Sequence, residues 1–522
     1  MKKIPILIGA FVLQNLLLSQ NIKIKITDFG AIGDAKTLNT ESIQRAIDTC
    51  AAQGGGQVIV PQGSFLCGSI RLKTGVELHL TEGGVLLGSS EHKDYKNDNR
   101  NSWYAFIMAN NQSNISITGK GTIDGQGRIL VQDVIRLWRA GAFPGAQVWD
   151  ESLREKNRPN ERFRPQLIFF QDCKNVEIDG INIQNGCSWI QTYEACEDVI
   201  IRNVCVESTS YWNNDGIDIV DCKNVLIRDC FVNSADDAIC LKSFDQNSRC
   251  ENITIENCTM RSSASAFKLG TSSYGGFSNI KAKNLTIYDT YRSAIALECV
   301  DGGVLENIDI SHVKATNTGN AIFIKLGHRI KERPVGKIDN IRIYDIEVEV
   351  PNAKPDKGYE KEGPLDTLEY NVLPSSIVGL PNFWVKNIFL KKIKIFFEGG
   401  GTPEKAYISV DSLHKIPEKA YAYPEFSMFG ELPAWGFFVR HCMGMVFEKV
   451  ELRLKYKDYR PAFVFDDVNK LRMTEVRIPI GGSIPAIILK DVQKTTFKKI
   501  FTPKSSIRKN LTTKKNHKKL TD

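Results

Sequence analysis

The fold is decided by two short stretches of sequence, NNDGIDI at residues 213–219 and SADDAICLK at residues 234–242. In each stretch an aspartate, Asp215 or Asp237, precedes a small residue and then apolar residues at alternate positions. Alternation with a period of two is typical of a β-strand. The two aspartates lie 22 residues apart. We therefore interpret them as equivalent positions on two successive turns of one repeating structure, with their carboxylates stacked.

Two strand patterns recur along the chain. An asparagine followed by apolar residues at alternate positions begins one strand of the repeat, and a small residue followed by the same alternation begins the other. The first pattern is found at Asn114, Asn175, Asn224, Asn252, Asn284, Asn307, Asn340 and Asn387, with Asp198 as a variant. The second is found at Gly216, Ala238, Ala266, Ala294 and Ala321.

Two strand patterns per repeat, with no helix between them, indicate a coil of short parallel strands. We predict an all-β protein, a right-handed single-stranded parallel β-helix. Asparagine suits the corners of such a coil because it tolerates the left-handed conformation and its amide can bond to the asparagine stacked beside it. A leucine-rich repeat would contain more leucine, and a propeller would contain antiparallel hairpin turns, so both are excluded.

The first part of the chain predicts a cap for one open end of the coil. A strand is expected at 22–26, and a helix is expected from Asn39 or Thr40 to Thr49, ended by the three glycines at 54–56. A terminal repeat of a solenoid needs such a cover.

The chain divides into three parts. Residues 1–19 are typical of a signal peptide, with Lys2 and Lys3 before the mostly apolar residues 4–18, so the protein is expected to be secreted or periplasmic. A membrane anchor is the alternative, but the apolar run is short and interrupted by Gln14 and Asn15. The β-helix domain is expected at 20–500, followed by a basic tail at 501–522.

Charge and cysteine usage narrow the classes of partner. Most of the net charge of +8 belongs to the tail, so the body offers no basic face to nucleic acid. Among the 13 cysteines, Cys173, Cys196 and Cys222 share one position of the repeat, and Cys230 and Cys258 stand where neighbouring repeats have mostly apolar residues. This placement predicts buried free thiols, and the absence of a CxxC pair makes a zinc site unlikely. We expect no cofactor, no metal, no membrane span and a monomer whose partner is a polysaccharide or oligosaccharide.

Three segments interrupt the repeat: residues 126–165, 350–386 and the aromatic segment 421–438. Long loops on a rigid scaffold often carry function, and aromatic faces suit sugar rings. The aromatic side chains could equally pack the loops themselves, and both interpretations stay open.

The carboxylates of Asp215, Asp236 and Asp237 predict acid–base chemistry. Adjacent rungs of a parallel sheet lie about 4.8 Å apart, and like charges forced together raise the pKa of one carboxyl group. One protonated and one ionised carboxyl group are what cleavage of a glycosidic bond requires. A ladder of aspartates that caps turns or binds Ca²⁺ is the alternative, and we expect Asp172 and Asp221 to be structural corner residues.

These motifs resemble glycoside hydrolase family 28, the polygalacturonase-like β-helix enzymes, from Ile22 to Asp467. The matching motifs are DFGAIGD at 28–34, GTIDG at 121–125, NND at 213–215 and DD at 236–237. The resemblance implies hydrolysis of a pectin-like polysaccharide, such as galacturonan or rhamnogalacturonan, with inversion. It also implies that Asp236 is the general acid and that Asp215 and Asp237 activate water.

The chain departs from the family at two motifs. The Gly-His-Gly of the family falls on Ala264–Ala266, with Ser265 in place of histidine, and its Arg-Ile-Lys falls on Ala296–Glu298. A carboxylate thus replaces a cation that binds uronate, which indicates a divergent member. The residues expected to bind substrate are Asn213, Asp218, Lys242, Lys268, Glu298, Lys325 and His328.

Instead of binding substrate, Lys268 could pair with Glu298 or with a catalytic aspartate.

Two alternatives to the hydrolase function remain. A polysaccharide lyase on the same fold would use Lys242 or Lys268 as its base. A non-catalytic β-helix would serve in carbohydrate binding or adhesion.

Overall fold

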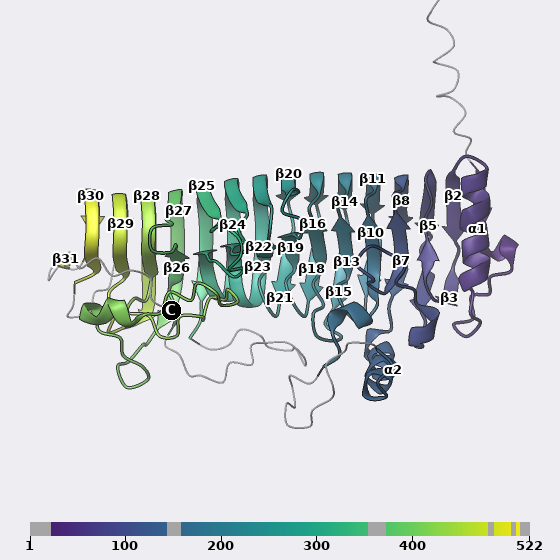
Figure 1. Ribbon diagram of the computed structural model, residues 1–522, viewed down its shortest axis with the longest axis horizontal. Coiled ribbons are helices and arrows are strands. Elements are labelled where there is room, and N and C mark those ends of the chain that lie inside the picture. Colours follow the sequence, from purple (N-terminus) through teal and green to yellow (C-terminus); the bar gives the residue numbers. More distant parts are fainter. Residues whose placement is uncertain (1–21, 144–157, 353–371, 479–484, 503–507, 512–522) are drawn as a thin grey trace, which may run out of the picture. The chain divides into compact units, whose positions relative to one another are not determined.

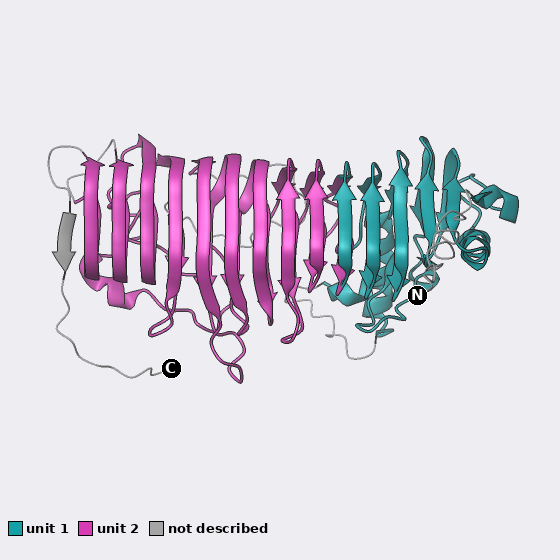
Figure 2. Ribbon diagram, turned by 90° about the horizontal axis from the view of Figure 1, so that it is seen from above, with its two compact units in different colours: residues 1–187, 196–205 teal, residues 188–195, 206–522 magenta. Residues whose placement is uncertain are grey.

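The computed structural model describes residues 22–143, 158–352, 372–478, 485–502 and 508–511. The predicted signal peptide, Trp149 in the first long segment and most of the basic tail lie outside these residues. The chain forms two compact units, which Figure 2 distinguishes by colour: residues 1–187 with 196–205, and residues 188–195 with 206–522. In the described part of the chain, no helix is long and apolar enough to cross a membrane.

The first unit is a coil of parallel strands. Pairing β2–β5–β8–β11–β14 forms one face, β3–β6–β9–β12 a second and β4–β7–β10 a third. Apolar residues at alternate positions of these strands, such as Val76, Leu78 and Leu80, are fully buried. The elements are β1 (Lys23–Lys25), η1 (Ile26–Phe29), α1 (Thr40–Ala52), β2 (Gly56–Val60), β3 (Gly63–Cys67), β4 (Ile70–Arg71), β5 (Val76–Leu80), β6 (Gly84–Gly88), η2 (His92–Asp94), β7 (Ala105–Asn110), β8 (Ser113–Gly119), β9 (Thr122–Asp124), α2 (Gly127–Arg139), η4 (Glu161–Phe163), β10 (Gln166–Gln171), β11 (Lys174–Asp179), β12 (Asn182–Gln184) and β14 (Glu197–Arg202).

Two helices accompany this coil. Helix α1 lies beside β2 at the end of the unit (Figure 1) and buries Ile43, Ala46, Ile47 and Cys50, so the predicted cap is confirmed. Helix α2 differs from the sequence prediction of a long aromatic loop over residues 126–165. Its buried residues, Leu130, Val131, Val134 and Trp138, follow helical spacing.

The second unit continues the same architecture. One face pairs β13–β16–β19–β22, then the last part of β23, then β24–β26–β28–β29–β30, all in parallel. The elements are β13 (Gln191–Glu194), β16 (Ile217–Val220), β17 (Lys223–Arg228), β18 (Phe231–Ser234), β19 (Ile239–Ser243), β20 (Cys250–Glu256), β21 (Thr259–Ser262), β22 (Phe267–Ser273), β23 (Gly276–Cys299), β24 (Val304–Leu326), β25 (Lys337–Val350), β26 (Ser375–Val378), β27 (Val385–Gly399), η5 (Val410–Lys415), β28 (Phe437–Tyr456), β29 (Phe463–Arg477), β30 (Ile487–Phe501) and β31 (Arg508–Leu511), while β15 (Cys205–Ser208) lies where the two units meet in the sequence. Each unit is a parallel β-helix, the predicted fold.

The corners are formed as predicted by single residues in the left-handed conformation. All eight predicted asparagines and Asp198 have φ between 53° and 58°. Side-chain amides bond from rung to rung, for example Asn252 to Asn224 at 3.3 Å and Asn340 to Asn307 at 2.7 Å. This stacking continues the corner geometry along the coil.

The register at Asn284 differs from the prediction. Asn279, not Asn284, stacks on Asn252, and the Asn284 amide bonds to Asn257 at 3.0 Å in the next corner along the chain. Both asparagines precede apolar residues at alternate positions, so the sequence pattern could not distinguish the two corners.

The cysteines are free thiols, as expected. All 13 lie in the described part of the chain as free thiols, and all except the half-buried Cys205 are buried.

Candidate active site

The register of the second unit stacks the two aspartates on adjacent rungs. Ile217 pairs with Ile239, and Ile239 pairs with Phe267, so Asp215 and Asp237 occupy one row and Ser265 continues it. Backbone bonds hold this row, since the N–H of Gly216 donates to the carbonyl of Asp237 at 2.9 Å. The stacking inferred from the 22-residue spacing is confirmed.

Asp215 and Asp218 share one ammonium group. Lys242 Nζ lies 2.9 Å from Asp215 Oδ2 and also contacts Asp218 Oδ1. Lys242 Nζ lies 4.3 Å from the ring centre of Trp189. Burial raises the pKa of Asp215 well above its usual value although Lys242 opposes this, and burial raises the pKa of Asp218 to about 6. Burial disfavours the charge of Lys242, but the two aspartates hold its pKa well above normal.

Asp237 and Glu298 share a second ammonium group. Lys268 Nζ lies 2.9 Å from Asp237 Oδ2 and 3.9 Å from Glu298 Oε2, and Thr271 donates to Glu298 at 3.0 Å. The N–H of Ser265 donates to Asp237 Oδ1 at 3.0 Å. Burial alone would raise the pKa of Asp237, but Lys268 and its neighbouring cations bring it below the usual value. Burial raises the pKa of Glu298 to about 7.

Asp236 is the more accessible carboxyl group of the set. Its Oδ2 lies 3.5 Å from the Asn213 amide, and its Oδ1 accepts the N–H of Asp237 at 2.9 Å. The hydroxyls of Ser234 and Ser262 donate to its backbone carbonyl and hold the turn. Burial and the charge of Asp237 raise the pKa of Asp236. The pKa values of the neighbouring Asp236 and Asp237 are thus shifted in opposite directions.

Four side chains beside the aspartates were not expected from the sequence. Arg292 acts electrostatically on Asp236 and Asp237, and its Nε lies 3.5 Å from Glu425 Oε1. The Tyr423 hydroxyl lies 3.4 Å from Lys268 Nζ. Tyr423 and Glu425 lie in the aromatic segment 421–438, which was the available signal for them. Trp189 lies between β12 and β13 and Arg292 lies in β23, and no sequence motif marks either residue.

Lys325 and His328 lie apart from the aspartates. Lys325 pairs with Glu298 in register, but its fully buried ammonium donates to the Glu418 carbonyl at 3.1 Å and lies 5.5 Å from the Phe429 ring centre. Burial lowers the pKa of Lys325 to about 7. His328 bonds to the Arg333 carbonyl at 2.7 Å. Within the described residues, the geometry brings the other expected substrate-binding residues to the aspartates but not these two.

The structural role expected for Asp172 and Asp221 agrees with their contacts. Both adopt the left-handed conformation of a corner. Asp221 Oδ2 accepts the N–H groups of Phe244 at 2.8 Å and Asp245 at 3.0 Å, and Asp172 pairs with Arg100 at 3.2 Å.

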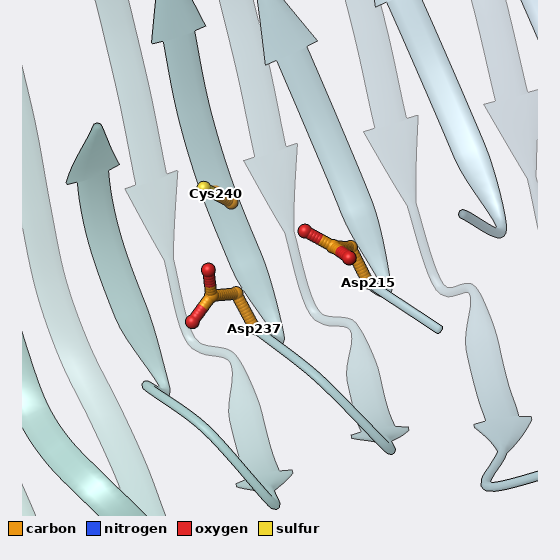
Figure 3. Close-up of side chains that lie close together, drawn as sticks. All are labelled: Asp215, Asp237 and Cys240. Carbon is orange, nitrogen blue, oxygen red and sulfur yellow. The ribbon is translucent and has the colours of Figure 1, made fainter. Parts of the chain in front are cut away.

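Among the described residues, Asp215, Asp237 and Cys240 form a group of metal-ligand types at the site, which Figure 3 shows on adjacent strands. Their ligand atoms lie within 4.8 Å of one another. Lysine ammonium groups already neutralise both carboxylates. The thiol donates to the Gly270 carbonyl at 3.0 Å, and burial raises its pKa well above normal, so it stays protonated. These residues do not fit a metal ion, which prefers deprotonated ligands.

The fold and the paired carboxyl groups are those of a carbohydrate-active β-helix. The chain matches the sequence pattern of Glycosyl hydrolases family 28 over residues 50–354, more than half of its length, and it belongs to that family. An endo-polygalacturonase of Pectobacterium carotovorum subsp. carotovorum is 25% identical over 369 residues, covering 68% of this chain and 87% of that protein. A probable polygalacturonase of Vitis vinifera is 27% identical over 320 residues, covering 58% of this chain and 56% of that protein. The chain therefore spans little more than half of the Vitis protein.

A solved structure supports the same relation. An exopolygalacturonase from Thermotoga maritima superposes with a TM-score of 0.58 and 26% sequence identity, covering 72% of this chain and 87% of that one.

Proposed function

We propose that the protein is a secreted glycoside hydrolase that cleaves O-glycosidic bonds of a pectin-like polysaccharide with inversion. The single observation that carries this proposal is geometric: Asp215 and Asp237 stack on adjacent rungs, and the more accessible Asp236 lies directly beside Asp237. In this setting burial and the charge of Asp237 raise the pKa of Asp236, whereas the nearby cations lower the pKa of Asp237. The first is suited to donate a proton and the second to accept one. The names of the family's polygalacturonases support a pectic substrate.

The chemistry uses both groups in one step. Asp236 donates its carboxyl proton to the glycosidic oxygen, and the bond from that oxygen to the anomeric carbon breaks. Asp237, ionised beside Lys268, accepts a proton from a water molecule whose oxygen bonds to the opposite face of the anomeric carbon. Asp215, on the adjacent rung, is the second carboxyl group on the side of the water.

The experiment that tests this proposal is product analysis on a panel of pectic and algal polysaccharides. Asp236→Asn should lower kcat by about 10²–10⁴-fold, the usual contribution of a general acid, while the circular dichroism spectrum stays unchanged. Asp172→Asn, at a structural corner, is the matched control and should retain activity. Full activity in Asp236→Asn contradicts the proposal, and so does a product that retains the anomeric configuration.

The lyase alternative receives no support from the lysines. A lyase needs a neutral lysine or arginine base near its substrate, whereas Lys242 and Lys268 are each ion-paired and have pKa values well above normal. An unsaturated product absorbing in the ultraviolet would instead favour the lyase.

The covering loop, defined as residues 400–436, supports attack at chain ends. Its apolar side chains pack on the outer face of the strands that follow the aspartates, against Phe323, Val378 and Phe438. The same loop brings Tyr423 and Glu425 to the aspartates. A polymer cannot continue across a covered face, so a long substrate should release short products from the start, with little early loss of viscosity.

Export and oligomeric state complete the proposal. Residues 1–19 are proposed to direct export and to be removed, which N-terminal sequencing of the mature protein checks. Residues 20–500 are proposed to act as one catalytic β-helix domain in a monomer, which sedimentation analysis checks.

A further inference from the structure

The charged groups around the aspartates restrict which class of sugar ring, neutral or acidic, can bind beside them. Asp218 and Glu298 lie in strands, Asp215, Asp236 and Asp237 lie in the turns that precede β16 and β19, and the covering loop adds Glu425. The cations that act on these groups are Lys242, Lys268 and Arg292. Carboxyl groups therefore outnumber cations about the site.

Each of these cations already has a carboxylate partner. Lys242 is held between Asp215 and Asp218, Lys268 between Asp237 and Glu298, and Arg292 lies 3.5 Å from Glu425. The two lysines are at most 7% exposed. To bind a uronate carboxylate, a lysine would have to leave one buried carboxylate unpaired, and an unpaired buried charge is strongly unfavourable.

Lys325, on the neighbouring rung, is not a spare cation either. Glu298 pairs in register with Lys325, but the Lys325 ammonium lies under the covering loop, at the Glu418 carbonyl and beside the Phe429 ring. The Lys325 ammonium cannot move to the aspartates without breaking its hydrogen bond to the Glu418 carbonyl.

Neutral hydroxyl groups would find suitable partners in the same place. The Asn213 amide and the Asp236 carboxyl group lie at the accessible side of the set. Tyr423, whose surface is 50% exposed, offers a hydroxyl group and a ring face beside Lys268. Carboxylates and amides that accept and donate hydrogen bonds, next to an aromatic face, are typical of sites for uncharged sugars.

We propose that the ring whose anomeric carbon is attacked is a neutral sugar and not a uronate, with Glu298 as the residue that excludes the uronate carboxylate. This inference rests on the proposed function and specifies its substrate class. It points to a pectic or related polymer that contains neutral rings.

Hydrolysis in ¹⁸O-labelled water tests this inference directly. Water attack places the label on the ring that occupied the cleaved position, and mass spectrometry of the products from mixed neutral and acidic pectic polysaccharides identifies that ring. The expected result is a label on a neutral hexose or deoxyhexose. A label on a uronate overturns the inference while leaving the hydrolase function intact. No release of product from any polysaccharide overturns the proposed function itself, and the inference falls with it.

The role of Glu298 is tested by an isosteric variant. At a pH above the raised pKa of Glu298, which is about 7, Glu298→Gln removes one negative charge. The ratio of kcat/KM for galacturonide to that for neutral aryl glycosides, measured there, should rise about tenfold, mainly through KM, because like-charge repulsion is relieved. The matched control is Glu306→Gln, which removes a carboxylate paired with Lys337 elsewhere in the same unit and should leave the ratio unchanged. An unchanged ratio in a folded Glu298→Gln variant overturns the assignment of Glu298.

Discussion

The opposite pKa shifts of Asp236 and Asp237 predict how activity depends on pH. Activity should fall as pH drops through the lowered pKa of Asp237, where the base becomes protonated, and as pH rises through the raised pKa of Asp236, where the acid is lost. The optimum should thus lie between these two pKa values, above the lowered pKa of Asp237 and below the raised pKa of Asp236. The measurement is kcat/KM against pH.

A variant at the base separates the two limbs of that profile. Asp237→Asn should lower kcat/KM by about 10²–10⁴-fold and remove the acidic limb from the remaining activity. A profile that keeps both limbs in Asp237→Asn would assign the base to another group, with Asp215 as the next residue to test.

At the scale of single residues, the sequence predicted the carboxyl groups better than their partners. Spacing along a coil determines which rung a residue occupies, so the stacking of Asp215 on Asp237 could be predicted from the sequence. The ion pairs of Lys268 depend on the direction of side chains across rungs, which the sequence does not specify. Lys268 contacts both Asp237 and Glu298. Tyr423 lies 155 residues beyond its partner Lys268, and Glu425 lies 133 residues beyond its partner Arg292, and no periodic pattern links such distant residues.

At the scale of elements, oppositely charged residues alternate along one row of the second unit. The register pairs Lys314 with Glu347, Glu347 with Lys394, Lys394 with Glu451 and Glu451 with Arg477. We call this row the charge ladder. Because opposite charges on adjacent strands attract, the ladder favours the observed pairing of the long strands β24, β25, β27, β28 and β29.

Reversal of one charge in the ladder should destabilise these strands. Lys394→Glu places three carboxylates on consecutive rungs, which should lower the free energy of unfolding by about 1 kcal/mol, since each like-charge pair costs about 0.2–1 kcal/mol. The measurement is urea denaturation at low and high salt. The difference from wild type should nearly vanish at 1 M salt, where the screening length is about 3 Å. Lys394→Gln should have a smaller effect, and a loss that persists in high salt would indicate lost packing instead.

The elements could be predicted wherever the repeat is regular. The corners at Asn307 and Asn340 followed from a single recurring residue type with one preferred conformation. Helix α2 and the register at Asn284 could not be predicted in the same way. Helix α2 lies outside the repeat. At Asn284, two corners share the same local sequence pattern, so the pattern does not show which corner the residue occupies.

At the scale of the second unit, rungs far from the aspartates hold the covering loop in place. Arg440 donates to the carbonyls of Leu413 and Ile416 in the loop while pairing with Asp466 on the next rung. Val464 and Ile488 add apolar contacts to the same loop. The last rungs therefore contribute to the site through Tyr423 and Glu425, although they hold none of its aspartates.

The attachment of the covering loop should depend on pH through His441. This imidazole lies 2.7 Å from Asp467 and 3.2 Å from Glu418, and these carboxylates raise its pKa although burial opposes its charge. A raised folded-state pKa means that the stabilisation is complete below about 6.5, the ordinary histidine value, and is lost as pH rises through the raised value. The half-exposed partners limit the effect to about 1 kcal/mol.

Hydrogen exchange of residues 400–436 across this pH range is the decisive measurement. After correction for intrinsic rates, protection of the loop should decrease above the raised pKa of His441 in the wild type. In His441→Gln protection should be lower at pH 6 and almost independent of pH, because the neutral amide cannot form the ion pairs. The strands β16 and β19, which do not contact His441, are the internal control and should exchange alike in both proteins. Loop protection that stays constant in the wild type would show that Arg440 and the apolar contacts hold the loop without His441.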